Sequence, residues 1–202
     1  MWLSLAAFAA AAAVLTITPG VDTALVLRSA AAQGPRAGAA AALGVCAGLF
    51  VWGAGAAFGL SALLTASATA FAALKIAGAG YLLFLGARLI LKPRQGLDLG
   101  GASRPGGAWR RGFLTNVLNP KVGVFYATFL PQFIPAGVGV AGFSLLLAAI
   151  HAALTLIWFA ALIALTVPLG RWLRKPAVVK AMDRLTGGVF LAFGARLALA
   201  RG

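Results

Sequence analysis

Acidic residues are nearly absent from this chain. Its 202 residues include three aspartates, no glutamate, one cysteine and one histidine. Such a set offers no cluster of metal ligands and no pair of carboxylates for acid–base catalysis, and the sequence has no glycine-rich phosphate-binding loop. It therefore predicts neither an enzyme nor a protein that binds a metal or another cofactor. The lone Cys46 can form no disulfide within the chain.

Charged residues are also missing from two long intervals, between Arg36 and Lys75 and between Lys121 and Arg171. The whole chain is 62% hydrophobic and has a mean hydropathy of +0.98. Each interval can hold more than one apolar segment of the roughly 20 residues that a helix needs to cross a bilayer. We therefore expect an all-α integral membrane protein with six transmembrane helices, at about 2–27, 37–63, 68–91, 110–133, 140–168 and 183–200.

Basic residues, by contrast, give the chain a net charge of +14 and gather around three of the five connections. The second and fourth connections, 64–67 and 134–139, carry no charge. The positive-inside rule produces such an alternation when connections 1, 3 and 5 are cytoplasmic and both termini lie outside. The basic loops would meet anionic lipid headgroups, so no nucleic-acid partner is needed. The three groups are Arg28 and Arg36; Arg88, Lys92, Arg94, Arg104, Arg110 and Arg111; and Arg171, Arg174, Lys175, Lys180 and Arg184.

Two short motifs recur in the same order in the two halves of the chain. "YLLFLGARLIL" from Tyr81 aligns with "VFLAFGARLAL" from Val189, and residues 18–21 (TPGV) align with residues 119–122 (NPKV). Three helices per half would place the second half upside down, and such inverted repeats are common among secondary transporters. We expect one transmembrane transporter domain over 1–202, with repeat 1 at about 1–91, a basic cytoplasmic loop at 92–109 and repeat 2 at about 110–202.

Proline motifs stand well inside the expected helices 2–27 and 110–133, as Pro19-Gly20 and as Pro120. Proline removes a backbone donor and clashes with the preceding helical turn. Freed backbone groups in hydrocarbon are costly unless they meet protein, water or a ligand. We therefore expect both helices to be broken beside a cavity near the membrane midplane. The alternative is that Pro19 only kinks a packed helix or marks its end.

Charged side chains accompany both expected breaks. Asp22 follows the first and Lys121 belongs to the second, although a charge at the centre of a membrane helix costs about 3 kcal/mol. Asp22 can hold a proton or pair with a substrate amine. It can instead form a structural ion pair with Lys121, Lys75 or Arg28, or lie near enough to the interface to be solvated. Lys121 can hold a carboxylate or neutralise Asp22.

Three further polar residues lie in apolar segments. Lys75 is about two turns into its expected helix, where it can pair with Asp22 or snorkel to the outer surface. His151 can relay protons or act as a hydrogen-bonded packing residue. Asp183, next to Arg184, indicates a solvated helix start.

The spaced motifs together resemble those of the LysE/RhtB family of amino-acid exporters, over essentially the whole chain. They are Thr18-Pro19-Gly20, the glycine-rich segment 44–59, "GAGYLLFLGARLIL" and Asn119-Pro120-Lys121. The resemblance implies a bacterial inner-membrane protein that exports amino acids or close derivatives, driven by the proton gradient. The family usually continues the first motif with a second proline, where this chain has Val21. Asp22 matches the family's acidic variant at the next position.

Our leading hypothesis is a secondary active exporter that works by alternating access as an antiporter in the lipid bilayer. Asp22 would exchange a proton or contact the substrate amine, while Asn119 and Lys121 would hold the substrate carboxylate. Two alternatives remain: a membrane scaffold or assembly protein that transports nothing, and a transporter of another small solute or ion. The many glycines and alanines would permit close helix contacts in a homo-oligomer.

Overall fold

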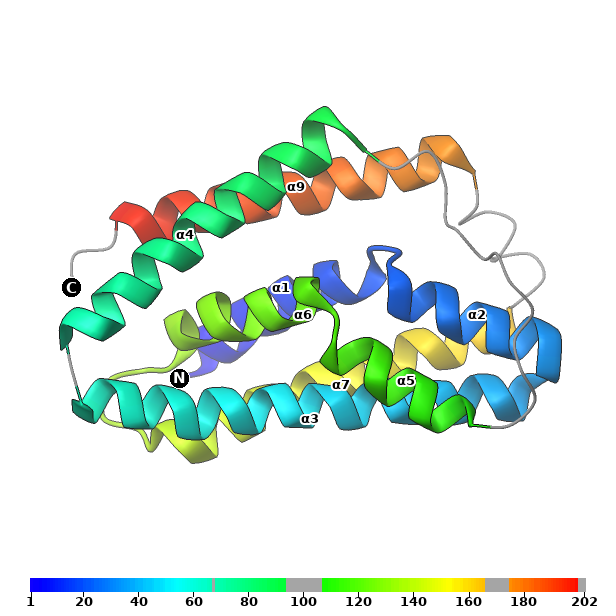
Figure 1. Cartoon of the computed structure of the whole chain (residues 1–202), viewed down its shortest axis with the longest axis horizontal. Helices are drawn as coiled ribbons and strands as arrows, with labels where there is room; N and C mark the ends of the chain where they lie inside the picture. Colours follow the sequence, from blue (N-terminus) through cyan, green and yellow to red (C-terminus); the bar gives the residue numbers. More distant parts are fainter. Residues whose placement is uncertain (67, 94–106, 166–174, 200–202) are drawn as a thin grey trace.

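The structure is a computed structural model that describes residues 1–66, 68–93, 107–165 and 175–199, and every regular element in these ranges is helical (Figure 1). Most elements are α-helices; η1 is a single π-helical turn and η2 a 3₁₀ turn. The elements are α1 (Trp2–Ile17), α2 (Val21–Gln33), α3 (Pro35–Ala66), α4 (Ala68–Leu91), α5 (Ala108–Val117), α6 (Pro120–Val124), η1 (Phe125–Phe129), η2 (Leu130–Phe133), α7 (Val140–Ala164) and α9 (Pro176–Leu199).

The described helices include clear membrane-spanning candidates, which agrees with the predicted all-α membrane protein. By length and composition, Pro35–Gly59 and Val140–Ala164 can each cross a bilayer. The pair α1 and α2 adds a third span if the bent pair is counted as one. The full set of six spans in two inverted repeats stays a prediction.

Both proline-containing helices are broken, as their sequences predict. α1 ends at Ile17 and α2 begins at Val21, at an angle of 55°. In the second half, α5 ends at Val117, and α6 begins at Pro120 after the extended residue Asn119. Proline suits this first helical position because the N–H that it lacks would have no partner there anyway. The chain thus has two interruptions of the kind expected.

The first expected helix boundary is wrong at its C-terminal side. α2 continues to Gln33, so Arg28 lies within the helix and not in the connection that follows it. The connection between α2 and α3 consists of Gly34 alone, whose φ of +88° suits a residue without a side chain. A single charged residue was therefore a poor marker for the end of this helix.

The last helix begins earlier than expected, at Pro176 in place of residue 183. Asp183 consequently lies about two turns inside α9 and is completely buried, so the expectation of a solvated helix start is wrong. The charges of this segment resembled a connection in the sequence. Pro176 is favourable at the start of α9 for two reasons. Its restricted φ is compatible with a helix, and the N–H that it lacks would have no partner in the first turn.

The helices pack in two groups. α3 packs along α5 and α7, whereas α4 packs mainly against α9, and Figure 1 shows this second pair running side by side. Glycines bring α3 and α5 into backbone contact: a Cβ on Gly44 would lie 2.0 Å from the carbonyl oxygen of Trp109, and one on Gly112 would lie 2.1 Å from that of Ala41. The α4–α9 pair meets the other helices near the first break, where the hydroxyls of Thr18 and Thr186 hydrogen-bond.

Two buried apolar clusters hold the bundle together. One surrounds η1 and contains Phe8, Phe125 and Phe129; the other lies where α2, α3 and α7 meet and contains Leu27 and Phe159. In lipid, such clusters stabilise the bundle mainly through van der Waals packing, because the lipid tails are as apolar as the buried side chains. The two breaks lie between the clusters, on a well-packed frame.

Candidate functional site at the two helix breaks

Asp22 ties the start of α2 to the second break. Its Oδ2 accepts hydrogen bonds from Nδ2 of Asn116 and Nδ2 of Asn119, each 3.0 Å long. The residue also lies in the first turn of α2, where the helix dipole favours a negative charge. Two amides of the second half and the N-terminal end of α2 thus hold this carboxylate in place.

Lys121 makes the reciprocal connection, from the second break to the first. Its Nζ donates to the carbonyl oxygens of Leu15, at 2.9 Å, and Thr18, at 3.2 Å. The last carbonyl groups of a helix lack partners within the helix and carry a partial negative charge. The ammonium group therefore caps α1 at the point where the chain leaves the helix.

Asn119 has two roles through one side chain. Its Oδ1 accepts a hydrogen bond of 3.0 Å from the backbone N–H of Lys121 and so caps α6. Its Nδ2 faces Asp22, as described above. Both contacts require the same orientation of the Asn119 amide, with its oxygen toward the N–H of Lys121 and its nitrogen toward Asp22.

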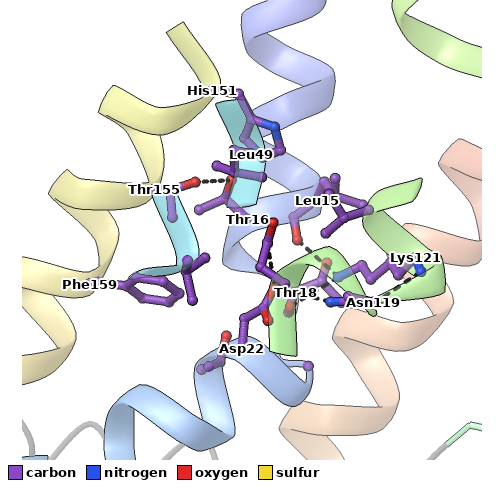
Figure 2. Close-up of a pocket in the computed structure, with 15 residues that line it drawn as sticks. Leu15, Thr16, Thr18, Asp22, Leu49, Asn119, Lys121, His151, Thr155 and Phe159 are labelled. Atoms are coloured by element: carbon purple, nitrogen blue, oxygen red, sulfur yellow. Dashed lines mark hydrogen bonds between the residues drawn. The ribbon is translucent and has the colours of Figure 1, made fainter. Parts of the chain in front are cut away.

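A small cavity of about 40 Å³ lies between the two breaks. That volume holds a few water molecules but no amino acid. Oδ1 of Asp22 is buried and has no hydrogen-bond partner among the described residues. A buried polar atom of this kind normally meets water or a ligand. Figure 2 shows Asp22, Asn119 and Lys121 converging around Thr18 at this cavity.

His151 lines the same cavity from α7 and is 3% exposed. Its Nδ1 lies 3.2 Å from the hydroxyl of Tyr126, which belongs to the π-helical turn η1. Single π-helical turns are frequent at functional sites because they redirect side chains. The structure thus brings His151 to the site, with Tyr126 as its partner. Lys75 belongs to α4, but its side chain lies outside the described part of the structure.

A second cavity, of about 430 Å³, also borders the breaks. Four residues line both cavities: Thr18, Gly20, Asn119 and Lys121. The other residues of the second cavity come mainly from α4 and its C-terminal end, with Phe190 from α9, and Pro120 is one of the rest. The two breaks therefore stand between a small polar cavity and a larger one.

The structure brings most of the predicted site residues together. Gly20, Asp22, Asn119 and Lys121 line the small cavity, Pro120 the larger one, and Pro19 lies between the two helices of the first break. In the described ranges, no group of three or more His, Cys, Asp or Glu side chains could hold a metal ion.

Sequence reasoning missed two members of the site, Asn116 and Tyr126. Asn116 is completely buried and donates to Asp22, yet it precedes the proline motif and belongs to α5. A lone amide three residues before Asn119 in an apolar segment was the available signal. Tyr126 carried none, because its pairing with His151 depends on how η1 packs against α7.

Known proteins are similar to this chain along most of its length. The family model described as LysE type translocator matches residues 13–201. An uncharacterised membrane protein of Bacillus subtilis is 32% identical, with 97% of this chain and 99% of the relative covered. A homoserine/homoserine lactone efflux protein of Salmonella typhi is 30% identical, over 93% and 92%. A leucine efflux protein of an Enterobacter species is 29% identical, over 91% and 90%. No solved structure matches.

Proposed function

Because this chain belongs to the LysE type translocator family, we propose that it exports amino acids or close derivatives across the bacterial inner membrane as a secondary active transporter. Two relatives that share nearly their whole length with it are named as efflux proteins for homoserine and its lactone and for leucine. The observation that carries the proposal is the pair of reciprocal contacts across the breaks. Opposite charges at interrupted membrane helices are expensive to bury and mark substrate or ion pathways.

The two halves are proposed to be inverted repeats, and the reciprocal contacts support this. Lys121 binds the carbonyls of Leu15 and Thr18, and Asp22 binds the side chains of Asn116 and Asn119. Under the repeat offset of 101 residues, positions 15 and 18 correspond to 116 and 119. Each break thus sends a charged side chain to equivalent positions in the other half.

The packing of α4 against α9 supports the same symmetry. A Cβ on Gly86 would lie 2.7 Å from the carbonyl oxygen of Gly187, and one on Gly194 would lie 3.2 Å from that of Ala79. The offset of 108 residues converts 86 into 194 and 79 into 187. Two elements related by a twofold axis make such paired contacts, in which each contact occurs twice with the roles exchanged.

The proposed orientation places the termini outside and the basic loops in the cytoplasm. In Figure 1, α1 begins in the left half of the bundle and α9 ends near its left end, whereas α3, α5 and α9 begin at the right end. Arg36, Arg110 and Lys180 lie near these three helix starts. Positive charge at one end of the bundle fits retention of that end on the cytoplasmic side.

The transported amino acid is proposed to bind between the two charges on its way through the protein. Its ammonium group would compete with Asn116 and Asn119 for Asp22, and its carboxylate would compete with the carbonyls of α1 for Lys121. Protonation of Asp22 would weaken the two charge-assisted hydrogen bonds that it accepts. Proton binding or substrate binding would therefore loosen the contacts between the breaks, and the proton gradient could drive alternating access. His151 is a candidate to pass protons toward this cavity.

Everted membrane vesicles provide the test, because their outer face corresponds to the cytoplasm. Vesicles with an acidic lumen should accumulate labelled leucine or homoserine faster than vesicles at equal pH. Asp22→Asn should abolish this dependence on the pH gradient, because an amide binds no proton in this range. An Asp22→Asn variant that keeps the dependence would contradict the proton role. Correctly folded wild type that moves no amino acid would favour the non-transporting scaffold.

A further inference from the structure

The charged side chains that line the larger cavity at the breaks are all basic. The cavity receives Arg88 and Lys92 from the end of α4, and Lys121 from the second break. No carboxylate is found among its lining residues in the described part of the chain. Asp22, the acidic residue of the break site, lines the small cavity instead. The larger cavity is therefore cationic.

Arg88 and Lys92 are one helical turn apart, and both side chains are exposed. Like charges at this spacing repel each other, and an anion between them removes the repulsion. Their position at the C-terminal end of α4 is also favourable for the helix dipole, and they can meet lipid headgroups. Neither the helix dipole nor the lipid headgroups explain why Arg88 and Lys92 line the same cavity as Lys121, which lies at the second break.

The remaining side chains of the cavity are largely apolar. Val21, Leu89 and Phe190 contribute to the wall, and Tyr81 adds an aromatic ring. The volume of about 430 Å³ falls within the range of roughly 300–1,000 Å³ that is typical of small-molecule pockets. An amino acid with an uncharged, mostly apolar side chain matches both parts of the lining, the cations through its carboxylate and the apolar wall through its side chain.

We propose that this cavity is the entry site of the transporter and that it selects amino acids with uncharged side chains. Arg88 and Lys92 bind the carboxylate, and the apolar wall receives the side chain. Lysine and arginine are disfavoured because their side chains bring a second positive charge to a cationic lining. A second carboxylate, as in glutamate, is disfavoured because the apolar wall would strip it of water. The inference rests on the proposed export function and adds its substrate class.

Competition in everted vesicles tests the selectivity. Unlabelled leucine and norvaline should compete with labelled leucine, whereas lysine, glutamate and leucinamide should compete poorly. Leucinamide matters most, because it keeps the side chain and the amine but lacks the carboxylate. Lysine or leucinamide competing as well as leucine would overturn the proposal while export itself stood. Wild-type vesicles that accumulate no amino acid would defeat the export function and this inference together.

Charge removal at α4 tests the residues. The double variant Arg88→Gln, Lys92→Gln should raise the KM for leucine about tenfold or more, the effect of losing one strong charge-assisted contact, with kcat changed much less. Arg110→Gln is the matched control, since Arg110 is an exposed cation on α5 that does not line the cavity. The single variant Arg88→Lys keeps the positive charge and should therefore retain most of the wild-type affinity for leucine. Size-exclusion profiles verify folding, and an unchanged KM in a folded double variant refutes the role.

Discussion

The two roles of Asn119 can be separated by substitution. Asn119→Ser keeps a good helix cap for α6 but removes the amide that donates to Asp22. Asn119→Ala removes both. Because serine and asparagine are nearly equal as capping residues, the difference between the two variants measures the cap, and the serine variant measures the contact with the carboxylate.

The hydrogen bond to Asp22 has a charged acceptor, a length of 3.0 Å and a partly buried setting. Loss of such a bond costs about 1.5–3 kcal/mol, although bonds between membrane helices average nearer 0.6 kcal/mol. Loss of an asparagine cap adds about 1 kcal/mol. We expect Asn119→Ser to lower the free energy of unfolding by about 1–2 kcal/mol and Asn119→Ala by about 2–3 kcal/mol.

Thermal unfolding in detergent, followed by size-exclusion chromatography, measures both variants. At roughly 2–4 °C per kcal/mol for a chain of this size, the apparent Tm should fall by about 2–8 °C for serine and further for alanine. The control is Asn119→Ser in an Asp22→Asn background, where the charge-assisted component is already lost and the serine should cost less. Equal Tm values for wild type and the serine variant, or an unchanged cost in the Asp22→Asn background, would refute the reasoning.

Two further substitutions probe the packing and the charge of the break site. Gly48→Ala should lower the Tm and weaken export, because its Cβ would lie 2.5 Å from Oδ1 of Asn116 and overpacking costs about 1–3 kcal/mol. The control is Gly55→Ala on the same helix, where a Cβ would meet nothing within 4 Å. This variant should leave export intact and raise stability by about 1 kcal/mol. Equal effects of the two would contradict the close contact. Lys121→Met should abolish export and lower the Tm, since it leaves two α1 carbonyls uncapped, and vesicle uptake beside unfolding curves checks this; full export by the variant would remove Lys121 from the pathway.

Several features of the fold were accessible from the sequence because they depend on local chemistry. Pro19 and Pro120 cannot continue the preceding helical turn whatever surrounds them, so both breaks were predictable. The long uncharged intervals required apolar helices. Helix ends were harder to place: the charges Arg28 and Asp183 resembled connections, yet each lies inside a helix. A charged residue in a helix is tolerated once tertiary neighbours or solvent receive it, and the sequence does not reveal those neighbours.

The partners within the site were less accessible. Asp22 and Lys121 were singled out because charge in an apolar segment is costly. A direct pair between them was one of the alternatives. The structure shows two amides of the second half at Asp22 and two carbonyls of the first half at Lys121. Asn116 could not be assigned to the site from the sequence, because its position beside Asp22 depends on how α5 packs against α3.

By itself, the sequence determined where the helices must break, that charge accompanies each break, and that the two halves carry related motifs. These are consequences of backbone chemistry and of solvation in lipid, which act at each residue separately. The tertiary structure decided which groups face one another and how the space around the breaks is divided. Contacts between residues about 100 positions apart depend on how the helices pack, so the small cavity with Asp22 and the larger one with Arg88 and Lys92 became visible only in the folded chain.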